Sequence, residues 1–182
     1  MSYPNAAAGL RLMFLGQILL IADTLLVWIP LVGPLLAIAG AVIEMAGIYR
    51  AGSDDENYRG ALVFAALALV LSVVAGFLDQ EAFLRSLLMA AGEICNLLMV
   101  YSVCTTTSNL LHSIGQEELS QRGGTVIKIY TACTAISIVC GVLGIIPIIN
   151  IAAALVNGIS GLVMVAGYVM YLLFLNGSSK VL

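Results

Sequence analysis

The sequence predicts an all-α integral membrane protein: one transmembrane domain over residues 1–182, in which six helices form a bundle of three hairpins. Three observations predict this class. Of the 182 residues, 62% are hydrophobic and only 9% are charged, whereas soluble domains are about 45–50% apolar and about 25% charged. The mean hydropathy is +1.10. Six apolar runs reach the length of about 20 residues that crosses a bilayer.

The six predicted spans are separated by polar or Gly/Pro breaks and cover residues 10–29, 31–49, 60–78, 82–111, 126–146 and 148–175. Pro30 alone separates the first two, and Pro147 the last two, because proline interrupts helical hydrogen bonding. The longest polar connections are residues 51–59 and 113–124. The acids at 54–56 predict a solvated connector, and the glycine pair at 123–124 predicts a break before the fifth span.

Basic residues support this count and predict an orientation. Lys and Arg near span ends concentrate on the cytoplasmic side of a membrane. With the N-terminus in the cytoplasm, only Arg85 falls outside, and the other six basic residues fall inside: Arg11, Arg50, Arg59, Arg122, Lys128 and Lys180. We therefore expect a plasma-membrane protein with both termini in the cytoplasm.

The first and third hairpins resemble each other, which suggests a parallel internal repeat of helices 1–2 and 5–6. Each has a helix, an Ile-Pro turn at Pro30 or Pro147, and then a helix rich in Gly and Ala. Both hairpins would enter the membrane from the same side, as in some transporters. Chance similarity between apolar helices is the alternative.

Small residues predict where helices pack, because membrane helices approach closely where side chains are small. We expect contacts, within one bundle or between subunits, at Gly33, Ala37 and Ala41 of the second helix and at Ala153, Gly158 and Gly161 of the sixth. The uncharged third helix is expected to face lipid. The fourth carries polar residues on two sides, which predicts a place in the middle of the bundle or along a hydrated path.

Three carboxylates lie inside the predicted spans: Asp23, Glu44 and Glu93. An ionised acid near the bilayer centre costs about 2.5–3.5 kcal/mol on insertion scales, so such residues are candidates for function. Asp23 and Glu93 are placed about 10 Å and 12 Å from the outer end by the helical rise. Glu44 is placed in the cytoplasmic third, where its side chain is able to reach the headgroups.

The candidate binding site for an ion or substrate is therefore an outer-half cluster, with Glu44 as a separate candidate. The cluster comprises Asp23, Glu93, Asn96 and Asn157, with Gln17 and Thr24 on adjoining turns. Two acids with amide neighbours suit a proton, a small cation or an amine. The alternative is a neutral carboxyl that hydrogen-bonds across helices and holds the bundle in register.

The sequence gives little support for catalysis, metal or cofactor binding, or nucleic-acid binding. The single histidine, His112, is far in depth from Ser160 of the Gly-x-Ser-Gly string, so no Ser-His pair forms. We therefore expect no enzyme, although an intramembrane enzyme stays an alternative, and no catalytic residue. The cysteines lack metal-ligand spacing, so we expect no metal and no cofactor. The low positive charge argues against nucleic-acid binding.

Two function classes follow. The first is a channel or transporter for a small cation, a proton or a small molecule that uses the intramembrane carboxylates. The second is a structural or accessory subunit that binds another membrane protein through Gly/Ala helix faces. The expected partners are the lipid bilayer and either further copies of this chain or another membrane protein.

Overall fold

The computed structural model describes residues 3–26, 29, 32–78, 83–143 and 150–182. These residues form six helices and no strand: α1 (Pro4–Leu26), α2 (Val32–Ala51), α3 (Tyr58–Gly76), α4 (Phe83–Ser113), α5 (Glu117–Leu143) and α6 (Asn150–Val181). Each helix contains a stretch long and apolar enough to cross a membrane. The prediction of an all-helical protein with six such spans is confirmed. The Ile-Pro turns at Pro30 and Pro147 lie outside the described residues.

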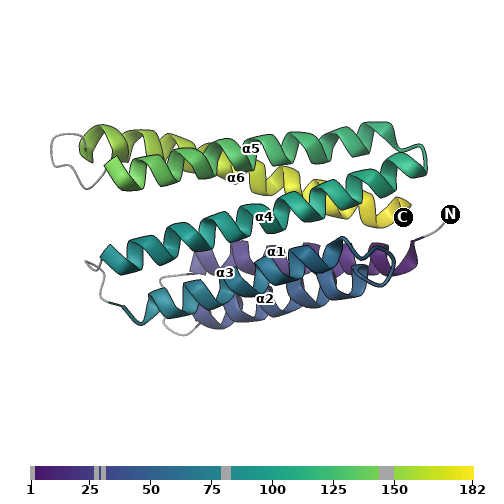
Figure 1. Cartoon of the computed structure of the whole chain (residues 1–182), viewed down its shortest axis with the longest axis horizontal. Helices are drawn as coiled ribbons and strands as arrows, with labels where there is room; N and C mark the ends of the chain where they lie inside the picture. The colour runs from purple at the N-terminus through teal and green to yellow at the C-terminus, as the bar shows by residue number, and fades with distance from the viewer. Residues whose placement is uncertain (1–2, 27–28, 30–31, 79–82, 144–149) are drawn as a thin grey trace.

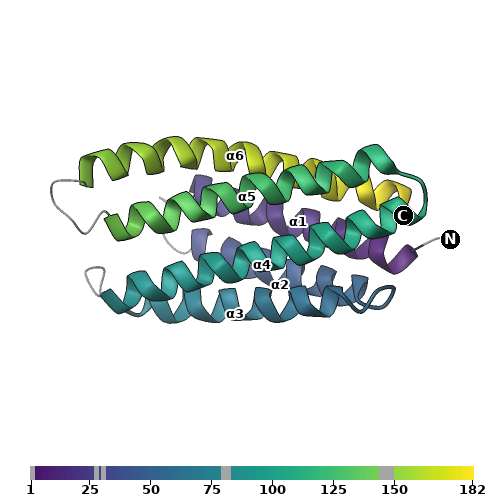
Figure 2. The same cartoon turned by 45° about the horizontal axis from the view of Figure 1, so that its top comes forward.

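The helices run side by side (Figure 1), and their contacts close them into a ring. Each packs against its neighbours in the chain, and α6 also packs against α1. Both termini lie at one end of the bundle, which we call the terminus end (Figures 1 and 2). The placement of the fourth helix in the middle is wrong. α4 contacts α3 and α5 as a member of the ring, and Leu87 and Leu98 on its outer face are exposed.

Glycines bring α1 and α2 into backbone contact. Gly9 and Gly16 on α1 face Gly47 and Gly40 on α2. A Cβ added at Gly16 would lie 2.7 Å from the Gly40 carbonyl oxygen, and one added at Gly40 would lie 2.9 Å from that of Gly16. Glycines seven residues apart stay on one side of a helix that packs at a shallow angle. This pair of stripes therefore fixes the register of α1 against α2.

Polar contacts join the terminus end of the ring. The backbone N–H groups of Asn5 and Ala6 each donate a 2.8 Å hydrogen bond to Asp54 Oδ2, and Asn5 Nδ2 donates to Asp54 Oδ1. Tyr3 N donates to the carbonyl oxygen of Leu182 at 2.9 Å. Asp54 thus satisfies free amides at the start of α1, as a capping residue does. The acidic segment at 54–56 is therefore more than a solvated connector.

The helices differ in length from the predicted spans because helix formation and membrane burial are separate properties. α5 begins at Glu117, nine residues before the predicted start, and α6 ends at Val181 rather than at residue 175. The polar first turns of α5 contain an ion pair of Arg122 with Glu118 at 2.7 Å. The sequence predicted a helix break at residues 123–124, and this prediction is wrong for Gly123. It lies inside α5, where a Cβ would clash with Ser108 Oγ and lie 3.0 Å from the Phe174 ring.

The outward faces of the helices are apolar. α3 has the smallest buried share of the six spans, which agrees with the prediction that it faces lipid. Its exposed residues include Val63, Leu67 and Val70. The core lies between the helices in the half of the ring near the termini, where Tyr58 and Tyr171 are fully buried.

Candidate functional site

A buried hydrogen bond joins Gln17 of α1 to Glu44 of α2. Gln17 Nε2 donates to Glu44 Oε1 at 2.6 Å, and the two residues are 6% and 4% exposed. The glycine contact explains this proximity, because Gly16 precedes Gln17 and packs against the backbone of Glu44. The expectation that Glu44 extends to the headgroups is therefore wrong. Tight α1–α2 packing directs its side chain inward.

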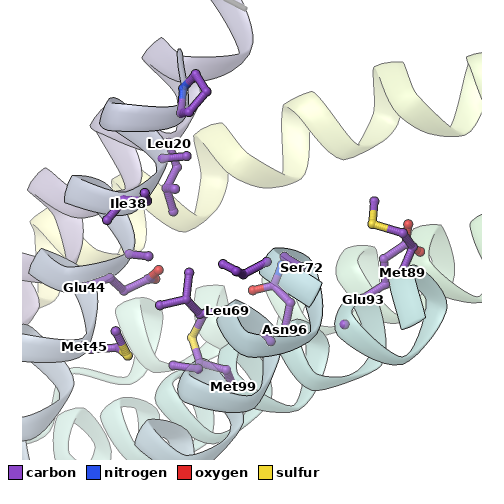
Figure 3. Close-up of a pocket in the computed structure, with 17 residues that line it drawn as sticks. Leu20, Ile38, Glu44, Met45, Leu69, Ser72, Met89, Glu93, Asn96 and Met99 are labelled. Atoms are coloured by element: carbon purple, nitrogen blue, oxygen red, sulfur yellow. The ribbon is translucent and has the colours of Figure 1, made fainter. Parts of the chain in front are cut away.

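A pocket of about 470 Å³ lies between α2, α3 and α4, with Leu20 of α1 at its edge. Glu44 and Glu93 both line it, and in Figure 3 they lie on opposite sides, with Ser72 and Asn96 between them. The rest of the lining is largely apolar and includes Leu20, Ile38, Met45, Leu69, Val73, Met89 and Met99. We call this the large pocket. It brings together two of the three carboxylates that the sequence singled out.

A second pocket of about 170 Å³ lies between α4, α5 and α6. Its lining is mostly polar: Glu93, Asn96, Cys133, Thr134, Ser137, Asn157, Ser160 and Tyr168, with Gly161 and Met164. We call this the small pocket. Glu93 and Asn96 line both pockets, because α4 separates them. Glu93 has no hydrogen bond or ion pair with another described residue. Among the described residues that line the two pockets there is no Lys, Arg or His.

Tyrosines of α5 and α6 pack against one another in the interior. Tyr130 of α5 packs edge-on against Tyr168 and Tyr171 of α6, with ring centroids 5.6 Å and 5.9 Å apart. The buried hydroxyls of Tyr130 and Tyr171 have no hydrogen-bond partner among the described residues. Tyr168 lines the small pocket together with Glu93.

Several predicted site residues meet as expected, and others do not. Glu93, Asn96 and Asn157 come together at the small pocket. Asp23 is half-buried and lines neither pocket. Gln17 contacts Glu44 instead of the outer-half cluster. The side chain of Thr24 lies outside the described residues. The structure thus divides the predicted cluster: Glu93, Asn96 and Asn157 share the small pocket, and Asp23 lies apart from them.

The small residues that were predicted to pack on the second and sixth helices also differ in their surroundings. Gly33 is buried in α2, in line with Gly40 and Gly47, whereas Ala37 and Ala41 line the large pocket. On α6, a Cβ added at Gly158 or Gly161 would meet nothing within 4 Å, so these glycines form no close helix contact inside the chain. The side chain of Ala153 is not described. A contact of this face between subunits stays a prediction.

Sequence reasoning missed three features of the site. It overlooked the α1–α2 glycine contact, although the spacing of seven from Gly9 to Gly16 and from Gly40 to Gly47 is visible in the sequence. It also overlooked Tyr168, which no sequence pattern distinguishes from the other tyrosines of its helix, and Ser72, although Ser72 is the only hydroxyl residue in the apolar run 61–78. Their roles depend on the rotation of each helix within the ring.

The described residues bring no three His, Cys, Asp or Glu side chains together in a group able to hold a metal ion. Comparison with known proteins finds no matching family model, no matching curated protein and no matching solved structure.

Proposed function

We propose that the protein transports a small cation, a proton or a small cationic molecule across a membrane and that Glu93 is its central binding residue. The observation that carries this proposal is the position of Glu93, which lines both pockets without a hydrogen-bonding or ionic partner among the described residues. A carboxylate at this depth is costly unless a proton, a cation or water compensates its charge.

A purely structural role accounts less well for Glu93. A carboxyl that holds helices in register forms a hydrogen bond across them, as Glu44 does with Gln17. Glu93 has no such bond to the described chain, its side chain is exposed, and it lines both pockets. The polar lining of the small pocket, from Asn157 through Thr134 to Glu93, supports a hydrated path from one side of the bundle to that carboxyl.

Measurement of cation flux across liposome membranes tests the proposal. Purified protein is reconstituted, and proton, sodium and potassium flux is measured for the wild type, Glu93→Gln and the control Asp23→Asn. Asp23 is also an acid in a spanning helix, but it lines neither pocket. We expect wild-type flux of at least one cation, a tenfold or larger loss in Glu93→Gln and little change in Asp23→Asn. The absence of all flux, or equal flux in the three proteins, overturns the proposal.

Two further elements of the architecture belong to this proposal. We infer that the terminus end is cytoplasmic, because six of the seven basic residues belong to helix segments near it while Arg85 lies near the start of α4. We also infer three hairpins with α1–α2 and α5–α6 as parallel copies. The pairwise packing of these helices supports the hairpins. Labelling of Ser53→Cys from either side of the vesicle tests the orientation.

The alternative function is an accessory subunit or homo-oligomer that uses the outer face of α6. Gly158 is exposed there, and a Cβ added to it would meet no described atom within 4 Å; small residues of this kind allow close approach of another helix. Crosslinking through Gly158→Cys in native membranes tests this face. A disulfide-linked dimer supports self-association, and a monomer that transports cations argues against it.

A further inference from the structure

The large pocket has a lining that fits one kind of ligand. Its volume of about 470 Å³ lies within the range of about 300–1,000 Å³ found for pockets that enclose drug-sized molecules. A bare ion or a proton gains no favourable interaction from this much apolar surface. The three methionines, Met45, Met89 and Met99, have flexible and polarisable side chains that adapt to ligands of different shape.

The polar groups of the pocket select positive charge. Glu44 and Glu93 are its only ionisable lining residues among those described, and Asn96 and Ser72 add hydrogen-bonding groups between them (Figure 3). An anion at this depth would meet two carboxyls and no basic residue. A cationic head group gains from the same arrangement, because charge attraction is strong where water is scarce.

The large pocket also opens on the side of the bundle, along the seam between α2 and α3. Among adjacent helices, α2 and α3 make the sparsest contact, and the pocket lies along this seam. Ile38, Val73 and Met89 line the pocket and are each more than 40% exposed on the surface of the spans. An amphipathic molecule dissolved in the bilayer therefore reaches the pocket from the side, without crossing a polar surface.

We infer that the large pocket binds a hydrophobic organic cation, an amine or quaternary onium with an apolar body, whose charge is compensated by Glu44 and Glu93. This inference rests on the proposed transport function and names its substrate class. Because Glu93 also lines the small pocket, a proton or small cation there and an organic cation in the large pocket compete for the same carboxyl. Exchange of one for the other is the expected form of transport.

Binding of tetraphenylphosphonium to the detergent-purified protein tests the inference, with tetraphenylborate as an anion of nearly the same shape. We expect saturable binding of the cation and no competition by the borate. Glu93→Gln is expected to weaken the binding at least tenfold, which corresponds to about 1.4 kcal/mol, and Asp23→Asn to leave it unchanged. Equal affinity for the two ions, or unchanged affinity in Glu93→Gln, overturns the inference.

A steric variant locates the site. Ala41→Leu fills the large pocket without altering either carboxyl, and Ala46→Leu on the exposed side of the same helix is its control. We expect Ala41→Leu to lower the affinity for tetraphenylphosphonium at least fivefold and Ala46→Leu to preserve it. Circular dichroism of each variant verifies that it is folded. Equal binding by both variants overturns the assignment to this pocket.

Failure of this inference is distinguishable from failure of the proposed function. Carboxylate-dependent flux of protons or metal cations without tetraphenylphosphonium binding leaves transport standing and excludes the organic cation. Binding that depends on Glu93 without flux of any cation, including the phosphonium itself, leaves the site standing and excludes transport.

Discussion

The contact between α1 and α2 allows a quantitative prediction for Gly47→Ala. A Cβ at this position would lie 2.6 Å from the Gly9 carbonyl oxygen and 2.8 Å from Met13 N. Ordinary van der Waals contact begins at 3.4 Å, so the two backbones must separate by several tenths of an ångström, and neither atom belongs to a side chain that moves aside. Gaps of about 0.5–1 Å forfeit a quarter to a half of the dispersion energy of the affected contacts.

Overpacking costs about 1–3 kcal/mol, and contact with two backbone atoms places this site in the upper part of that range, at about 2–3 kcal/mol; the better helix propensity of alanine returns about 1 kcal/mol. We therefore expect the free energy of unfolding to fall by about 1–2 kcal/mol, which corresponds to a decrease in Tm of about 2–8 °C. Thermal unfolding in detergent, followed by circular dichroism, measures it. Gly124→Ala is the control, since a Cβ there meets nothing within 4 Å. If both variants are equally stable, the glycines do not set this contact.

Three further predictions concern individual hydrogen bonds. Asp54→Ala removes three bonds at the start of α1 and is expected to lower the free energy of unfolding by about 1–2 kcal/mol. Gln17→Leu leaves the buried Glu44 without its donor and is expected to cost about 1–3 kcal/mol, more than Glu44→Gln, which retains a hydrogen-bonding group. In a double-mutant cycle, Tyr58→Phe and Thr107→Val are expected to couple by about 0.5–1.5 kcal/mol, because their hydroxyls are 2.7 Å apart and buried.

Controls make each of these predictions specific. Asp55→Ala changes the same loop but removes only a bond from Asn57 N, so its unfolding transition is expected to stay close to that of the wild type. An Asp54→Ala protein as stable as Asp55→Ala would contradict the capping role. Equal stability of Gln17→Leu and Glu44→Gln would contradict the account of the buried pair. Additive effects at Tyr58 and Thr107 would contradict their coupling.

The number and approximate position of the spans were predictable from composition. Runs of apolar residues predicted the six helices, and errors occurred at polar ends such as residues 117–125 of α5, which are helical but unsuited to lipid. Part of the candidate site was predictable too, because a carboxylate such as Glu93 inside an apolar run is conspicuous by itself. Its polar neighbours Asn96 and Asn157 were inferred from depth along the helices, which follows from the rise per residue.

Which pocket each side chain faces within the ring was not predictable in the same way. The rise per residue predicted one depth for Asp23 and Glu93, but the structure places Asp23 away from both pockets and places Glu44 across the large pocket from Glu93. The rotation of α2 decides this outcome, and it follows from the glycines at 40 and 47 that meet α1. A helix with apolar residues on every side carries little information about which face turns inward.

The sequence by itself determined that lipid is the solvent of this chain, that six helices are available to cross it, and that three acids lie within them. These are local properties, because the free energy of transfer into a bilayer sums over the residues of each segment. Only the tertiary structure decided which acids share a pocket, because Glu44 and Glu93 belong to different helices. Their positions around one pocket result from backbone contact between α1 and α2 and from closure of the ring, to which residues all along the chain contribute.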